Sequence, residues 1–207
     1  KLELGNEDFS QLSLPQTFSM EFQGRKLKKL EIKTAGTFQI KNSSTAVAVS
    51  LYLSEKYPAA NERCIRQGLK QTEIPCRMEL VQKSPQIVLD VAHNIQAIQI
   101  LTENLPLFFT YKRLIVVLGI LKDKDYKKII KILSSEADIF IMTEPKTERA
   151  LSARLLEKEA LAYNKKTFIE KETSKALNKA KELADPHDLT LFTGSFYMVG
   201  EVLSELH

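Results

Sequence analysis

The stretch that decides the fold reads Ile87-Val88-Leu89-Asp90-Val91-Ala92-His93-Asn94. Its branched apolar residues predict a strand buried on both faces, as in a parallel sheet. Asn94 is a favourable N-cap for a helix over residues 95–105, where apolar residues recur at helical spacing. Asp90 and His93 therefore fall where a strand ends and a helix begins, which in open α/β sheets is where ligands bind.

The chain downstream of this stretch alternates between strands and helices. Apolar runs predict strands at residues 87–89, 114–118, 138–142, 167–169 and 188–192. Helices are predicted at residues 95–105, 125–133, 152–163, 173–183 and 194–206. Ser152 and Thr173 are predicted to cap two of them. Such alternation implies parallel strands with right-handed crossovers, and hence a Rossmann-like, mostly parallel α/β sheet over residues 86–207.

The chain upstream follows a different pattern. Alternating apolar and polar residues on both sides of a turn predict a β-hairpin, and two segments with helical spacing follow it. These strands and helices are expected at residues 18–22, 27–32, 42–57 and 61–71. We therefore expect a smaller α+β segment at residues 1–75 and a linker at residues 76–85, ahead of the sheet.

Composition and charge exclude several classes of protein. The net charge of +4 is too small to indicate nucleic-acid binding, and the basic cluster at residues 25–29 suits a solvated strand face. No apolar run is long enough to cross a membrane. Cys64 and Cys76 lack zinc-ligand spacing and are too few for a disulfide framework, which indicates a reducing cytoplasm. Because the chain begins with Lys1 and not Met, we expect a fragment of a longer protein.

Polar residues also follow two other predicted strands. Lys124 lies in the loop after the second strand, where its ammonium can meet a carboxylate or a phosphate. Ser195 follows the fifth strand and either caps the last helix or forms an anion site with the free N–H groups there. Each of these side chains, like Asp90 and His93, also has the plainer interpretation of a solvated or turn-capping residue. Since the carboxyl ends of parallel strands share one edge, we expect all of them on one rim.

Motifs for independent catalysis are absent from the sequence. The glycines form neither the G-x-x-x-x-G-K-[ST] loop that cradles ATP phosphates nor G-x-G-x-x-G. There is no His, Cys and Asp cluster at metal spacing, and Ser195 has no evident base. The residues by themselves therefore indicate a Rossmann-like binding domain after a smaller α+β segment, with no catalytic residue and no metal ligand assigned.

Five short segments, in order, resemble the folylpolyglutamate synthase/dihydrofolate synthase branch of the Mur ligase superfamily. Residues 36–42 resemble "G-x-H-Q-x-x-N", residues 75–79 "P-G-R-M-E", residues 89–94 "L-D-G-A-H-N", residues 119–125 "G-x-L-x-D-K-D" and residues 194–202 "G-S-L-Y-L-V-G-E-V". The last segment favours the folate branch over the peptidoglycan ligases. Departures from these patterns are Phe38 for His, Cys76 for Gly, Val91 for Gly and Ile95 for a Pro.

This resemblance implies an ATP-dependent carboxylate–amine ligase. Such enzymes phosphorylate a substrate carboxylate with ATP, and the amine of L-glutamate then attacks the acyl phosphate. The substrates would be dihydropteroate, or a folate whose glutamate tail is extended, and the cofactors ATP and Mg²⁺. The phosphate loop and magnesium ligands would lie upstream of Lys1, so residues 1–75 would be the remnant of a central ATPase domain. We expect a cytoplasmic monomer that binds no nucleic acid and no membrane, and whose 207 residues are inactive alone.

The resemblance also implies roles for particular residues. They are Gln39, Asn42, Arg77, Asp90 and His93 for the nucleotide, and Lys124 and Ser195 for the incoming glutamate. All of them would position charge around the reaction without making bonds. On this view, Asp90→Ala should remove productive ATP use and leave the fold intact. Two alternatives stay open, namely another Mur-type amino-acid ligase and a non-catalytic nucleotide-binding or interaction module.

Overall fold

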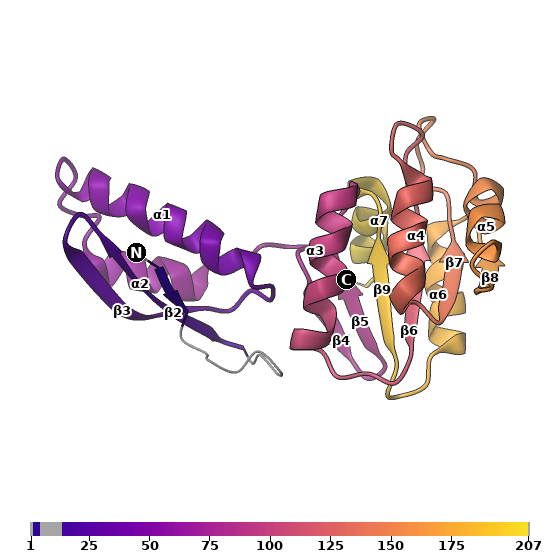
Figure 1. Cartoon of the computed structure of the whole chain (residues 1–207), viewed down its shortest axis with the longest axis horizontal. Coiled ribbons are helices and arrows are strands. Elements are labelled where there is room, and N and C mark those ends of the chain that lie inside the picture. The colour runs from indigo at the N-terminus through magenta and orange to yellow at the C-terminus, as the bar shows by residue number, and fades with distance from the viewer. Residues whose placement is uncertain (1, 5–13, 207) are drawn as a thin grey trace. The chain divides into compact units, whose positions relative to one another are not determined.

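The computed structural model describes residues 2–4 and 14–206, which divide into two compact units at residues 1–75 and 76–207 (Figure 1). The second unit is built on a six-stranded sheet in the order β4-β5-β9-β6-β7-β8. The strands are β4 (Glu79–Lys83), β5 (Gln86–Leu89), β6 (Leu114–Leu118), β7 (Ile139–Met142), β8 (Lys166–Ile169) and β9 (Leu189–Thr193). All neighbours pair in parallel except β4, which is antiparallel to β5. The predicted mostly parallel α/β fold is confirmed.

Helices cover both faces of this sheet. They are α3 (Ile95–Phe108), α4 (Tyr126–Glu136), α5 (Ala153–Leu161), α6 (Thr173–Leu183) and α7 (Phe196–Leu206). Helices α3, α4 and α5 pack side by side on one face, while α6 and α7 pack together on the other (Figure 1). Every residue of β6, β7 and β9 is buried, which explains the continuous apolar runs of β6 and β7. Strand β9 is apolar except for Thr190 and Thr193, which are buried as well.

Strand β4 lies inside the segment that the sequence analysis assigned to the linker. Its residues are polar or only partly buried, and Leu80 remains 39% exposed. An edge strand of this kind buries no apolar run, so the sequence carries no clear signal for it. Its pairing with β5 joins the beginning of the second unit to the stretch at residues 87–94.

The helix caps were predicted with mixed success. Asn94 does cap α3, because its side-chain oxygen accepts the N–H of Ala97 at 2.9 Å. Ser152 occupies the N-cap position of α5 but makes no capping hydrogen bond, and Glu144 accepts the N–H of Ala153 at 3.0 Å in its place. The predicted cap by Thr173 is wrong, since Thr173 is the first residue of α6 itself.

The first unit is a three-stranded antiparallel sheet with two helices. Its elements are β1 (Leu2–Leu4), β2 (Gln16–Phe22), β3 (Arg25–Ile32), α1 (Phe38–Ser54) and α2 (Glu62–Gln71). The predicted hairpin is confirmed as β2 and β3, and its inward side chains form one core with both helices. Helix α1 begins at residue 38, four residues before the predicted start at 42. None of the helices within residues 14–206 is long and apolar enough to cross a bilayer.

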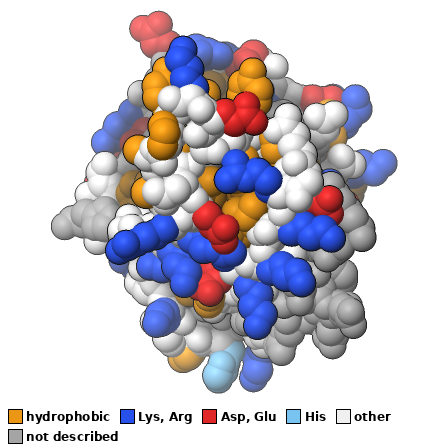
Figure 2. Space-filling model, turned by 90° about the vertical axis from the view of Figure 1, so that its left-hand side faces the viewer, with side chains coloured by type: hydrophobic (Ala, Val, Ile, Leu, Met, Phe, Trp, Pro, Cys, Tyr) orange, Lys and Arg blue, Asp and Glu red, His pale blue; other side chains and the backbone are white. Residues whose placement is uncertain are grey.

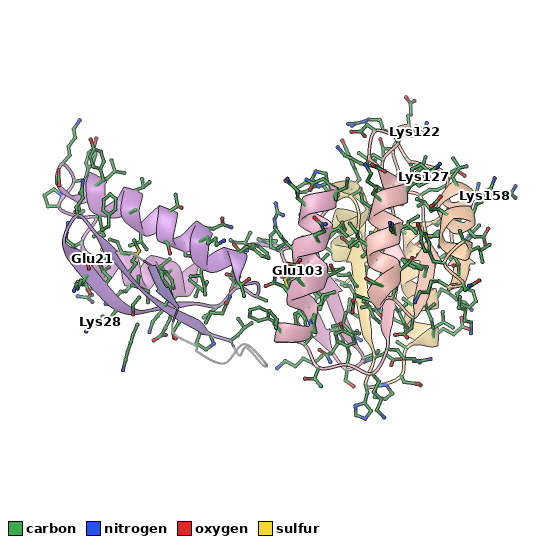
Figure 3. The ribbon with its side chains drawn as sticks, in the orientation of Figure 1. Glu21, Lys28, Glu103, Lys122, Lys127 and Lys158 are labelled. Atoms are coloured by element: carbon green, nitrogen blue, oxygen red, sulfur yellow. The ribbon has the colours of Figure 1, made fainter. Side chains whose placement is uncertain are left out.

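The basic cluster of β3 lies on a solvated face, as predicted. Arg25, Lys26, Lys28 and Lys29 are exposed, whereas Leu27 between them is buried. Lys and Arg side chains spread over the face in Figure 2 with Asp and Glu between them. The side chains of Glu21 and Lys28 project outward from the hairpin (Figure 3).

An ion-pair network joins the amino ends of β6 and β9 in the second unit. The Arg113 guanidinium donates to Asp188 (Nε to Oδ2, 3.1 Å) and to Asp185 (Nη2 to Oδ2, 2.9 Å). The Asp188 side chain is only 1% exposed and also accepts the backbone N–H of Asp185. Burial acts to raise the pKa of Asp188, but the hydrogen bonds from Arg113 and Asp185 outweigh it and hold this pKa below its usual range.

We predict that Arg113→Met lowers the free energy of unfolding of the second unit at pH 7. The substitution leaves the Asp188 carboxylate buried without its cation, at a cost of about 2 kcal/mol after allowance for the partly exposed guanidinium. A carboxyl whose folded-state pKa is lowered contributes stability above its unfolded pKa, about 3.9, and loses it as the pH falls through the folded pKa.

Urea unfolding at pH 7 and at about pH 3 tests this prediction, because the difference between variant and wild type should shrink at the lower pH. Arg149→Met is the matched control, since its partner Asp123 is exposed. Equal stability of Arg113→Met and wild type at pH 7 would show that the network contributes little.

Candidate functional site

The polar residues predicted for one rim do lie at neighbouring strand ends. Strand β9 lies between β5 and β6, so the exits of these three strands are adjacent. The chain leaves β5 toward α3 on one face of the sheet and leaves β9 toward α7 on the other. In open α/β sheets such a reversal creates a crevice outside the carboxyl ends of the strands. The candidate residues at this edge come from the exits of β5, β9 and β6.

The backbones of these exits approach one another closely. Gly194 donates its N–H to the carbonyl of Ala92 at 2.9 Å, and Gly119 donates to the carbonyl of Thr193 at 3.3 Å. Gly194 has a φ of +111°, and a Cβ placed there would lie 2.7 Å from the carbonyl oxygen of Gly119. Glycine is therefore required at position 194 by both conformation and space.

Asp90 is buried and already holds two backbone donors. Its Oδ2 accepts the N–H of Met78 at 2.9 Å, and its Oδ1 accepts the N–H of Ala92 at 2.7 Å. Burial raises the pKa of Asp90, against the opposing effects of these two N–H groups and of the charges on Arg77 and His93. The carboxylate therefore joins the segment before β4 to the loop after β5, which is a structural task. The expectation that Asp90→Ala leaves the fold intact does not agree with these contacts.

The backbone around Arg77 is held in an unusual conformation. Cys76 and Met78 on either side have φ values of +57° and +48°, in the left-handed region that favours glycine. The carbonyl of Cys76 accepts the N–H of Val91 at 3.0 Å, in addition to the bond between Met78 and Asp90. Cys76 stands where the resembled pattern has Gly, and this φ explains why glycine suits the position.

Arg77, His93 and Phe196 form a cluster beside the exits of β5 and β9. The Arg77 guanidinium carbon lies 6.0 Å from the centre of the Phe196 ring, and the His93 and Phe196 ring centres are 5.5 Å apart. His93 Nδ1 lies 2.9 Å from the carbonyl oxygen of Val91, so in the neutral ring Nδ1 carries the proton and Nε2 is the acceptor. Within the described part of the chain, Arg77 makes no hydrogen bond or ion pair. Its guanidinium is therefore available to an anion.

Ser195 and Lys124 have local partners on the same edge. The Ser195 side chain is buried and accepts the N–H of Met198 at 3.2 Å. Of the two predicted roles, this contact is the helix cap. Lys124 pairs with Asp123 at 2.8 Å. That aspartate also binds Arg149 at 3.2 Å, which holds the loop in place. In Figure 3, Lys122 lies on this loop and Lys127 lies at the beginning of α4.

Gln39 and Asn42 belong to the first unit and bond to each other. Both lie in the first turns of α1, where the Asn42 amide donates to Gln39 Oε1 at 2.9 Å. Gln39 is buried, while Asn42 is exposed. Their predicted contact with a nucleotide stays a prediction.

Phe196 was missed by the sequence analysis, although it lies inside a quoted motif. A single exposed aromatic residue at the start of a helix carries no periodic signal. No group of His, Cys, Asp and Glu within residues 2–4 and 14–206 is arranged to hold a metal ion.

Comparison with known proteins gives the site a context. A family described as "Mur ligase, glutamate ligase domain" matches residues 76–196. A dihydrofolate synthase/folylpolyglutamate synthase of Buchnera aphidicola subsp. Schizaphis graminum is 30% identical over 84% of this chain and 41% of its own length. Among solved structures, Mycobacterium tuberculosis folylpolyglutamate synthase complexed with ADP has a TM-score of 0.83 at 21% identity, over 100% of this chain and 46% of that one.

A second solved structure bears on ligands. It is the bifunctional folylpolyglutamate synthase/dihydrofolate synthase of Yersinia pestis CO92, complexed with AMPPNP and Mn ion. The TM-score is 0.76 at 26% identity, over 92% of this chain and 44% of that one. The chain thus spans less than half the length of each of these three proteins.

We predict that Asp90→Ala destabilises the second unit. The change leaves the buried N–H groups of Met78 and Ala92 without an acceptor, at a combined cost of about 2–4 kcal/mol. Asp90→Asn keeps one acceptor oxygen and should lose less. His93→Ala is the control, because this partly exposed ring satisfies no buried backbone N–H group and, among the described residues, hydrogen-bonds to the Val91 carbonyl alone. Urea unfolding followed by circular dichroism measures the difference, and an unchanged midpoint for Asp90→Ala would refute the structural role.

Proposed function

Since the chain belongs to the Mur ligase family, through the glutamate ligase domain at residues 76–196, we propose that it is the carboxyl-terminal part of an ATP-dependent folate glutamate ligase. The complete protein would join L-glutamate to dihydropteroate or to a folate that already carries glutamate. The names of its relatives support this substrate class. The observation that carries the proposal is the Arg77 guanidinium, which has no hydrogen-bond or ion-pair partner among the described residues and lies near His93 and Asp90 at the strand ends of this domain.

The reaction we propose proceeds in two steps. The substrate carboxylate attacks the γ-phosphorus of ATP, which releases ADP and forms an acyl phosphate. The amine of glutamate then attacks the acyl carbon, loses a proton and displaces inorganic phosphate, so that an amide bond forms. Both steps depend on holding charged groups together, which is the kind of catalysis that fixed donors and cations provide.

Nucleotide binding is the role we propose for Arg77, His93 and Asp90. The guanidinium has its donors free, and a phosphate oxygen is the acceptor that they suit best. His93 Nε2 can accept a hydrogen bond from a ribose hydroxyl. Asp90 takes part chiefly by holding the backbone N–H of Met78, the residue after Arg77. We propose Gln39 and Asn42 for the adenine side, on the resemblance of their segment alone.

Glutamate binding is the role we propose for Lys124 and Ser195. A glutamate carboxylate would compete with Asp123 for the Lys124 ammonium. The Lys124 Nζ lies 2.8 Å from Asp123 Oδ2. The pKa of Asp123 is held below its usual range chiefly by this hydrogen bond, so the carboxylate is charged and the exchange is one anion for another. Ser195 lies at the first turn of α7, where backbone N–H groups favour an anion.

Magnesium would assist phosphoryl transfer by neutralising phosphate charge, but the described residues of this chain do not suit it. They offer no group of three ligands for a metal ion. We propose that the metal ligands and the phosphate loop lie in the part of the protein that corresponds to the remaining length of its relatives. No step of the reaction is therefore assigned to a metal held by residues 2–4 or 14–206.

The exposed apolar side chains of α1 are evidence that a larger ATPase domain surrounds the first unit in the complete protein. Val47 and Leu51 are buried in the core, yet Val49, Tyr52 and Leu53 on other sides of the helix are 53%, 60% and 41% exposed. A helix that is apolar all round is normally buried on all sides. We propose that the rest of an ATPase domain in the same protein covers these side chains.

In the complete ligase, we predict that substitutions separate the two substrates. Arg77→Gln should raise the KM for ATP about tenfold or more, because a charge-assisted contact is lost. Lys124→Ala should raise the KM for glutamate instead. Lys127→Ala, on the exposed first turn of α4, is the control. Folate-dependent ADP release measures all three, and unchanged KM values for Arg77→Gln and Lys124→Ala would contradict the site assignment.

The isolated 207 residues should show no folate-dependent ADP release. They contain no loop to hold the ATP phosphates and no described metal site, so phosphoryl transfer lacks its main electrostatic support. The same coupled assay, at high protein concentration and with glutamate and dihydropteroate present, checks this. Turnover above the no-enzyme blank would overturn the proposal that this chain is only part of the ligase.

A further inference from the structure

Phe196 occupies a position that the fold itself does not explain. Its side chain is 58% exposed at the first residue of α7, where neither core packing nor capping needs it. Ser195 makes the capping bond, and Met198 and Val199 supply the core contacts of this turn. A large apolar ring left in solvent beside the strand ends calls for another reason.

We propose that Phe196 is a positioning residue for the nucleotide site, whose ring holds the Arg77 guanidinium and the His93 imidazole in the arrangement that receives ATP. The inference rests on the proposed function, but it adds a residue and a task to it. Phe196 acts through two neighbours and need not touch the reacting atoms.

The backbone of Arg77 is held by hydrogen bonds of its neighbours, whereas its side chain is not. The backbone at Arg77 is fixed, because Met78 N–H is bonded to Asp90 and Cys76 carbonyl to Val91. The guanidinium, in contrast, has no hydrogen-bond partner among the described residues. Its one close ring contact is Phe196, 6.0 Å from the guanidinium carbon, within the range where a cation is attracted to an aromatic face. The ring therefore restricts a long side chain that otherwise moves freely.

His93 is held from two directions. Its Nδ1 bonds to the carbonyl of Val91, and its ring lies against Phe196 at 5.5 Å between centres with a tilt of 54°. Tilted rings at this separation attract each other. One contact fixes which nitrogen carries the proton, and the other restricts rotation of the ring. Together they leave Nε2 as the acceptor on a ring with a defined orientation.

The resembled sequence pattern has Leu where this chain has Phe196. Leucine is apolar and of similar reach, but it has no aromatic face to attract a cation. Phe196→Leu therefore removes the proposed attraction while keeping an apolar side chain. Phe196→Tyr keeps the ring and should keep the function. Tyr197 is a matched control, because it is also exposed, at 50%, and has no ring or cation contact within the described residues.

Steady-state kinetics of the complete ligase test the proposal. Phe196→Leu should raise the KM for ATP about three- to tenfold, with kcat and the KM for glutamate within about twofold of wild type. Phe196→Tyr should keep the wild-type KM for ATP, and Tyr197→Ala should not change this KM. In an Arg77→Gln, His93→Ala background, Phe196→Leu should have no further effect, since its two partners are absent. An unchanged KM in Phe196→Leu, or a full additional effect in that background, overturns the proposal.

An NMR measurement on the 207-residue chain separates this inference from the proposed function. The Arg77 Nε–H and His93 ring protons should show ring-current shifts that disappear in Phe196→Leu and persist in Tyr197→Ala. If the wild-type chain lacks these shifts, the positioning role is wrong whatever the protein catalyses. If the shifts are present but the complete protein neither binds nor uses ATP, the proposed function fails while the contacts stand, and the task assigned to Phe196 fails with it.

Discussion

The buried carboxylate of Asp90 connects two segments on which the whole candidate site depends. It accepts one N–H from Met78, before β4, and one from Ala92, after β5. Removing a carboxylate from water is costly, and the two backbone donors and the nearby Arg77 charge offset part of that cost. Because these donors come from both sides of a strand pair, the carboxylate fixes the backbone that carries Arg77.

The cluster that results is a charged surface at the carboxyl ends of the strands. The Arg77 guanidinium, the His93 imidazole and the Phe196 ring lie together, and none of them is arranged as a nucleophile or a base. The close approach of Gly194 to Gly119 holds the strand exits that present them. Residues of this kind can place charge around a reacting group without forming bonds to it, which agrees with the glutamate ligase domain that residues 76–196 match.

Much of the fold was predictable because buried parallel strands differ from the rest of the chain in composition. The runs that became β5, β6, β7 and β9 are mostly apolar and buried, so their order along the chain implied the sheet. The edge strand β4 was not predictable, since it pairs on one side only and buries little. The sequence also did not show which apolar side chains of α1 would be exposed. Apolar residues lie on more than one side of this helix, so their spacing does not single out one buried face.

The fold class and the strand ends that carry the candidate residues could be inferred from the sequence, because local apolar patterns and short motifs record them directly. Only the tertiary structure decided what these residues contact. Asp90 and Met78 are twelve residues apart, and Arg77 and Phe196 are far more distant along the chain. Such pairings arise from the sheet order that brings β5 beside β9, and no local pattern in the sequence encodes which distant side chain will meet which. The structural task of Asp90 and the contact role of Phe196 therefore became visible only in the folded chain.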